Sequence, residues 1–132
     1  MINLNDWPHR WYGRWKEEAN DTAVEHFPSI IDVSGAEWDD DEIQKVVSYL
    51  RSGTVAIASP GIARNVVDGT QLSATTSWKS DGVWLWPDTL AHYLQRYRIQ
   101  LPGKLVDHIR ANGYVVPSVP EHALRNLDLP TF

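Results

Sequence analysis

The chain has 132 residues, a hydrophobic fraction of 42% and a formal net charge of −5, which fits one acidic domain with its own core. It contains no cysteine, so a disulfide framework and a thiolate metal site are both excluded. No apolar run approaches the roughly 20 residues that span a bilayer, and residues 1–6 lack the basic and apolar regions of a signal peptide. We therefore expect a cytoplasmic protein without a membrane partner.

The acidic charge is concentrated in the first third of the chain. Residues 1–42 hold eleven acidic and three basic side chains, a formal charge of −8, whereas residues 43–132 hold six acidic and nine basic ones, a formal charge of +3. This distribution opposes binding to nucleic acid, whose phosphates require clustered Lys and Arg. It favours a basic protein partner through electrostatic steering, although net charge also serves solubility.

Two short segments precede the first strong helix signal. Trp7, Trp11 and Trp15 recur every fourth residue, which predicts a helix over residues 8–18 with its indoles docked on the core. The segment Phe27 to Ile31 suggests a short extended piece.

The clearest helix signal covers residues 40–51. Asp39 is a favourable N-cap, and Glu42 follows three residues later in capping-box register. Gly53 is placed to end the helix. One face of this helix is apolar and consists of Ile43, Val46, Val47 and Leu50.

The next region predicts strands and turns. Residues 54–58 are β-like, and Asp68-Gly69 is a strong hairpin dipeptide. Residues 71–78 suit a half-exposed strand, and residues 83–86 suit a short strand antiparallel to it. Within this last strand Trp84 and Trp86 alternate with Leu85, so the two indoles should share one face.

Helices follow over residues 88–98 and 103–112, introduced by Pro87 and Pro102. Residues 114–117 are predicted to form a final edge strand, and a short helix is expected after Pro120. The predicted fold class is α+β: a single domain with a small, mostly antiparallel sheet from residues 54–86 and 114–117, and helices packed on one face.

No motif for catalysis or cofactor binding emerges. Residues 59–64 lack the glycine spacing and the lysine of a phosphate loop, and no nucleophile-elbow pattern is present. The five histidines lack metal-ligand spacing; they are His9, His26, His92, His108 and His122. We therefore expect no enzymatic activity, no metal and no cofactor.

Residues 37–42 are the strongest candidate for a partner-binding site, because one Trp adjoins five acids. The acids at the start of the predicted helix have a simpler explanation as a solvated cap. The alternative is a surface for a basic partner, with the indole as interface anchor. The candidate residues are Glu37, Trp38, Asp39, Asp40, Asp41 and Glu42.

A second hypothesis is a small-molecule pocket in a binding domain or small enzyme, lined by Trp84, Trp86 and Tyr93. A third is a structural or adaptor subunit of a larger complex.

The densest signature is Ser80-Asp81-Gly82-Val83-Trp84-Leu85-Trp86-Pro87, followed by Leu90, Tyr93, Tyr97, Leu101-Pro102 and Gly113 to Pro117. This segment of about forty residues resembles the C-terminal half of small uncharacterised bacterial proteins, some of which look like immunity proteins encoded beside secreted or contact-delivered toxins. The resemblance implies cytoplasmic binding of a cognate toxin and carries no catalytic motif. Our leading prediction is a stoichiometric protein-binding protein, an immunity protein that occludes a basic toxin domain such as a nuclease.

Overall fold

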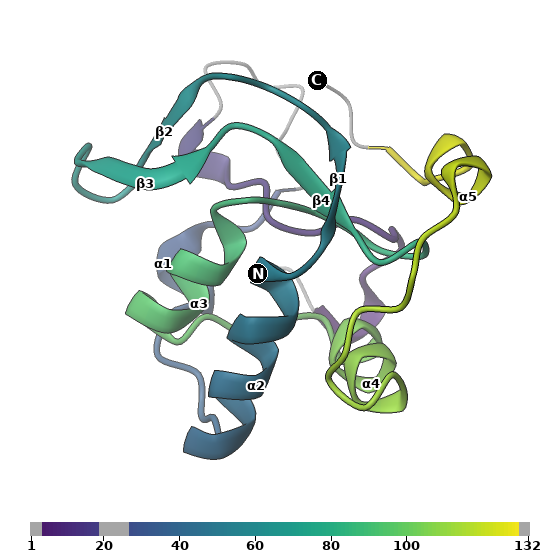
Figure 1. Cartoon of the computed structure of the whole chain (residues 1–132). Helices are drawn as coiled ribbons and strands as arrows, with labels where there is room; N and C mark the ends of the chain where they lie inside the picture. The colour runs from purple at the N-terminus through teal and green to yellow at the C-terminus, as the bar shows by residue number, and fades with distance from the viewer. Residues whose placement is uncertain (1–3, 19–26, 130–132) are drawn as a thin grey trace.

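The computed structural model describes residues 4–18 and 27–129, and these form an α+β fold (Figure 1). Two short 3-10 helices, η1 (Leu4–Asp6) and η2 (Lys16–Glu18), lie near the N-terminus. The α-helices are α1 (Ile30–Val33), α2 (Asp40–Arg51), α3 (Leu90–Tyr97), α4 (Gly103–Ala111) and α5 (Glu121–Arg125). The strands are β1 (Thr54–Ile57), β2 (Ile62–Arg64), β3 (Gln71–Thr75), β4 (Trp78–Ser80) and β5 (Leu85–Pro87). The predicted fold class is confirmed.

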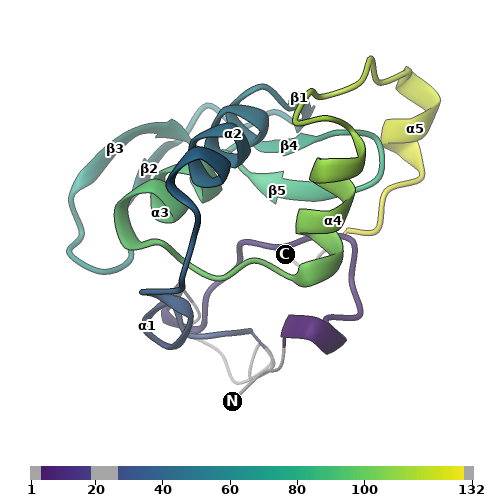
Figure 2. The ribbon, with the colours of Figure 1, turned by 90° about the horizontal axis from the view of Figure 1, so that it is seen from below.

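The strands form two antiparallel sheets, one in the order β1-β4-β5 and the other made of β2 and β3. Helices α2 and α3 lie together below the strands in Figure 1. The N-terminal segment runs alongside β5, as Figure 2 shows, with a parallel bridge between Trp11 and Leu85. The amide of Tyr12 donates to the carbonyl of Leu85 at 3.0 Å, so β5 has a neighbour on each side.

The hairpin predicted around Asp68-Gly69 is confirmed as β2 and β3. Gly69 has a φ of +74°, and the Asp68 carboxylate accepts from the Thr70 amide at 2.9 Å. The single strand predicted over residues 71–78 is instead divided between the two sheets. The chain bends at Thr76, and the hydroxyl of the next residue, Ser77, accepts from the Ser59 amide at 2.8 Å and donates to the Ser59 carbonyl at 3.0 Å.

Helix α2 confirms the prediction for residues 40–51. The Asp39 carboxylate accepts from the Glu42 amide at 2.9 Å, as an N-cap does. At the other end, the Trp86 indole N–H donates to the Leu50 carbonyl at 2.9 Å. The helix is therefore held at both ends by side chains, and its apolar face is buried, with α3 packed alongside it.

The helix predicted over residues 8–18 is wrong. Trp7, Trp11 and Trp15 are buried, but the backbone between η1 and η2 is not helical. The Tyr12 amide donates to the Leu85 carbonyl, the Leu85 amide donates to the Arg10 carbonyl, and Gly13 adopts a φ of +122°. A Cβ on Gly13 would lie 2.5 Å from the Pro87 ring, so only glycine fits at this close approach.

Two further predictions also fail. Residues 114–117 form no strand: Tyr114 has a φ of +61°, and its amide returns to the Ile109 carbonyl at 3.1 Å as part of the end of α4. The extended piece predicted at Phe27 to Ile31 contains the start of α1 instead. The short helix expected after Pro120 is confirmed as α5.

The core is unusually aromatic. All seven Trp lie in the described part of the chain, and six are buried, Trp38 being the partly exposed one. Several rings meet edge to face, for example Trp7 and Trp11 with centroids 5.3 Å apart. Trp84, Leu85 and Trp86 are all buried, so both faces of β5 are covered.

Candidate protein-binding groove

The acidic residues predicted as a partner site lie where the α1–α2 connection enters α2. This connection is held by backbone bonds to the C-terminal end of α3. The Gly35 amide donates to the Tyr97 carbonyl at 2.9 Å, and the Ala36 amide donates to the Arg98 carbonyl at 2.8 Å. The backbone that carries the acids is therefore fixed by residues about 60 positions later in the chain.

A groove of about 270 Å³ opens beside this connection. Four of the six predicted residues line it, on one side: Glu37, Trp38, Asp39 and Glu42. Asp107 and Arg110 of α4 line the other side. Asp40 and Asp41 are exposed at the first turn of α2, next to the groove in sequence.

Trp38 is half-buried, and both of its ends are fixed. Its indole N–H donates to the Ile99 carbonyl at 2.9 Å, and its own carbonyl accepts from Arg98 Nη2 at 2.8 Å. The indole is therefore oriented by the fold before any partner binds. A fixed, partly exposed indole is the type of side chain that anchors protein interfaces.

Glu42 is held by three internal hydrogen bonds. Arg110 donates to it through Nε at 2.7 Å and Nη2 at 2.6 Å, and the Tyr114 hydroxyl donates at 2.6 Å. Arg110 and Tyr114 lower the pKa of Glu42 from 4.5 to about 2. The reciprocal capping-box bond is thus replaced by a link from α2 to the end of α4.

The other acids differ in how far they are engaged. Asp39 caps α2, and Asp40 forms a 3.3 Å ion pair with Arg98 while its own side chain stays 92% exposed. Among the described residues, no cation lies within 4 Å of Glu37 or Asp41. These two carboxylates are exposed and carry charge that the described fold leaves uncompensated at close range.

Sequence reasoning missed the far wall of the groove. Asp107 and Arg110 lie on α4, and no local pattern relates them to residues 37–42. Asp107 is 77% exposed and sits 3.6 Å from Arg110 at helical spacing. The i, i+3 spacing of Asp107 and Arg110 was the one sequence feature that could have pointed to this wall, but such pairs are common on helix surfaces.

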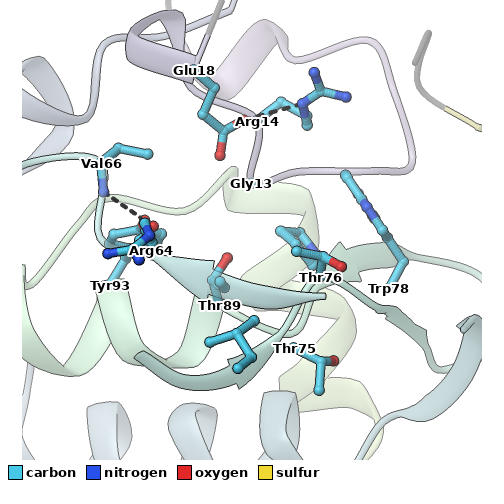
Figure 3. A pocket seen from close by; sticks show the side chains of 13 residues that line it. Gly13, Arg14, Glu18, Arg64, Val66, Thr75, Thr76, Trp78, Thr89 and Tyr93 are labelled. Atoms are coloured by element: carbon cyan, nitrogen blue, oxygen red, sulfur yellow. Dashed lines mark hydrogen bonds and ion pairs between the residues drawn. The ribbon is translucent and has the colours of Figure 1, made fainter. Parts of the chain in front are cut away.

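The predicted aromatic pocket is divided by the structure. Trp84 and Trp86 lie in the core, with exposed fractions of 2% and 1%. Tyr93 borders a cavity of about 360 Å³, shown in Figure 3, together with Trp78. The Tyr93 hydroxyl accepts from the Val66 amide at 3.1 Å, and burial raises its pKa to about 12. This ring is therefore a neutral wall of the cavity.

The signature around Ser80 and Asp81 forms a buried polar cluster. Asp81 accepts from the Val83 amide at 3.0 Å, the Trp84 amide at 2.8 Å and the Tyr49 hydroxyl at 2.6 Å. The Nε2 atom of His108 lies 3.1 Å from the same carboxylate. The Ser80 hydroxyl donates to the Trp84 carbonyl at 2.7 Å. These residues connect the β4–β5 turn to α2 and α4. The Ser80-Asp81 part of the motif behind the resemblance therefore has a structural role.

Within residues 4–18 and 27–129, no three His, Asp or Glu side chains gather as a metal ion would require. The helices of the same residues are all too short or too polar to cross a membrane. No family model, curated protein or solved structure matches the chain. The resemblance to immunity proteins accordingly stays a prediction based on its motif residues.

Proposed function

We propose that this protein binds a basic segment of a partner protein in the acidic groove between α2 and α4. The observation that carries this proposal is the pair Glu37 and Asp41, exposed carboxylates without a cation within 4 Å among the described residues. A basic partner compensates these charges, and complementary charge raises the rate of association.

The groove also offers a short-range anchor. Trp38 is fixed by Ile99 and Arg98, so burying its exposed part against a partner costs little conformational entropy. Charged residues around a central aromatic side chain are a common arrangement at protein interfaces. We expect Glu37 and Asp41 to govern the association rate and Trp38 to govern the dissociation rate.

The most concrete form of this function is immunity against a basic toxin domain such as a nuclease. Such a toxin uses cations to hold its phosphate substrate. An acidic surface placed over those cations blocks the substrate by occlusion, and the inhibitor needs no chemistry of its own. The motif resemblance supports this form, and the charge of residues 1–42 is consistent with it.

The test first asks whether a toxin domain is encoded beside the gene for this chain, and then uses that domain. Co-expression should protect cells, and the purified proteins should form a stoichiometric complex whose association slows as salt rises. The double variant Glu37→Gln/Asp41→Asn should lower the association rate about tenfold and leave the fold stable, since exposed substitutions rarely change stability by more than about 0.5 kcal/mol.

The matched control is Glu121→Gln/Asp68→Asn, which removes the same charge from α5 and the β2–β3 turn. Asn at position 68 keeps an oxygen acceptor for Thr70. The control complex should associate at the wild-type rate. A partner that is acidic, or equal slowing by both double variants, would contradict binding at the groove. A neighbouring gene with no toxin domain would contradict the immunity form.

A further inference from the structure

The acidic groove between α2 and α4 has the size of a pocket for one inserted side chain. Its volume of about 270 Å³ lies just below the roughly 300–1,000 Å³ typical of small-molecule sites. Residues 98–102, which join α3 to α4 in Figure 2, contribute Gln100 and Leu101 to its lining, and α4 contributes Val106. The lining is therefore part apolar and part charged, which suits a long side chain with an apolar stem and a charged end.

The charges in the lining select a cationic end. Four carboxylates line the groove, and among the described residues of the lining Arg110 is the only cation. Arg110 is committed to Glu42 by hydrogen bonds of 2.7 Å and 2.6 Å, and its 3.6 Å separation from Asp107 is too long for another. Glu37 has no cation within 4 Å in the described part of the chain. Glu37 and Asp107 can therefore both accept from an added cation.

The placement of these two carboxylates favours a guanidinium over an ammonium group. Glu37 lines one side of the groove and Asp107 the other, so a cation that pairs with both needs donors in several directions. Guanidinium is planar and carries five N–H donors that match carboxylates, whereas ammonium is a compact point charge.

Trp38 adds a second preference for guanidinium. Its indole lines the groove, is partly exposed, and is fixed by the 2.9 Å hydrogen bond from its N–H to the Ile99 carbonyl. Guanidinium stacks on indole rings more often than ammonium does, because it is flat and more weakly hydrated.

We infer that the groove receives one arginine side chain of the partner protein. The guanidinium group pairs with Glu37 and Asp107 and stacks on Trp38. The methylene stem packs against Leu101 and Val106. This inference rests on the proposed function, since it names the side chain that the basic partner inserts. Arginine is also enriched among the residues that dominate the binding energy of protein interfaces.

The experiment titrates the full chain, labelled with ¹⁵N, with three acetylated and amidated peptides at constant salt. One has the sequence Gly-Ser-Arg-Ser-Gly, and the others carry lysine or citrulline at the centre. Citrulline has nearly the shape of arginine without its charge. The arginine peptide should give saturable shifts of the Trp38 indole N–H and of amides in residues 36–39 and 100–107. The lysine peptide should bind about fivefold more weakly, and the citrulline peptide about tenfold or more.

The outcomes separate this inference from the proposed function. Equal affinity for the arginine and lysine peptides would overturn the choice of arginine and leave binding of a basic segment intact. Absence of saturable shifts at the groove with the arginine peptide would also overturn the inference. Failure of the proposed function is recorded by a different measurement, the absence of a complex between the whole proteins.

Variants test whether the groove itself makes the distinction. Glu37→Gln and Asp107→Asn should each weaken binding of the arginine peptide about fivefold, because each removes one carboxylate that pairs with the guanidinium. Asp32→Asn is the matched control, since Asp32 is an exposed carboxylate on α1 outside the groove lining. It should bind within about twofold of wild type, because salt screens its distant charge. Equal weakening by Asp32→Asn and Asp107→Asn would assign the effect to overall charge and overturn the inference. Thermal unfolding verifies that each variant is folded.

Discussion

Asp39 and Asp81 make the same kind of local hydrogen bond but lie in different environments. Each carboxylate accepts a hydrogen bond from a backbone amide a few residues later, Asp39 from Glu42 and Asp81 from Val83 and Trp84. Asp39 is exposed at the groove, whereas the Asp81 side chain is completely buried and also contacts the Tyr49 hydroxyl.

This difference separates residues that build the fold from residues that face solvent. A carboxylate that several buried donors share cannot be removed without leaving those donors unpaired. When a carboxylate with one exposed amide partner is removed, that amide can bond to water instead, so the loss of stability is small. Burial and the number of donors, rather than the residue type, therefore indicate which acids are free to meet a partner.

The largest effect is expected for Asp81→Ala. It leaves the Tyr49 hydroxyl, two amides and His108 without their shared acceptor, and removing one member of such a buried polar group costs about 3–5 kcal/mol. Urea denaturation followed by circular dichroism measures this loss. Asp81→Asn, which retains one oxygen for the amides, should lose less. A free energy of unfolding within about 1 kcal/mol of wild type for the Ala variant would contradict the role assigned to this cluster.

A smaller effect is expected for Asp39→Ala. Loss of an N-cap acceptor typically costs about 0.5–2 kcal/mol, and the Glu42 amide is then solvated by water. Asp39→Asn keeps a capping oxygen and should stay close to wild type in the same urea titration. An Ala variant with an unchanged denaturation midpoint would remove Asp39 from its capping role, and the contrast with Asp81 would then be larger than proposed.

Local rules in the sequence predicted the parts of the fold that depend on neighbours in the chain. Helix α2 was recognisable from Asp39, its apolar face and Gly53, and the β2–β3 hairpin from Asp68-Gly69. The N-terminal segment was mispredicted because its conformation depends on pairing with β5, about 75 residues later. A repeat of Trp at every fourth position is compatible with a helix, but here it reflects burial of a non-helical chain.

Only one wall of the candidate groove could be predicted, because the other wall depends on contacts between residues far apart in the chain. Residues 37–42 stand out by composition, but Asp107 and Arg110 reach them only through the packing of α4. Composition likewise suggested a pocket at Trp84 and Trp86, whose burial in the core no local pattern distinguishes from a ligand site.

The smallest effect is expected for Glu42, which lines the groove but whose carboxylate is engaged by internal hydrogen bonds. Its pKa in the folded protein is about 2, below the ordinary value of 4.5, because Arg110 and Tyr114 donate to the carboxylate. A group with a lowered pKa stabilises the folded state fully above its ordinary value. That contribution is lost as the pH falls from about 4.5 through 2.

The free energy of unfolding of the wild type should therefore decline between pH 4.5 and pH 2, and Glu42→Gln should reduce that decline. The change in slope should be well below the limit of about 1.4 kcal/mol per pH unit for one proton, because Arg110 is exposed to solvent and screening weakens the pair. Asp41→Asn is the control within the same acidic run, since no cation lies within 4 Å of Asp41 in the described residues. Its slope should match that of wild type. Urea titrations at several pH values measure all three proteins, and parallel curves for wild type and Glu42→Gln would place Glu42 with the solvent-facing acids.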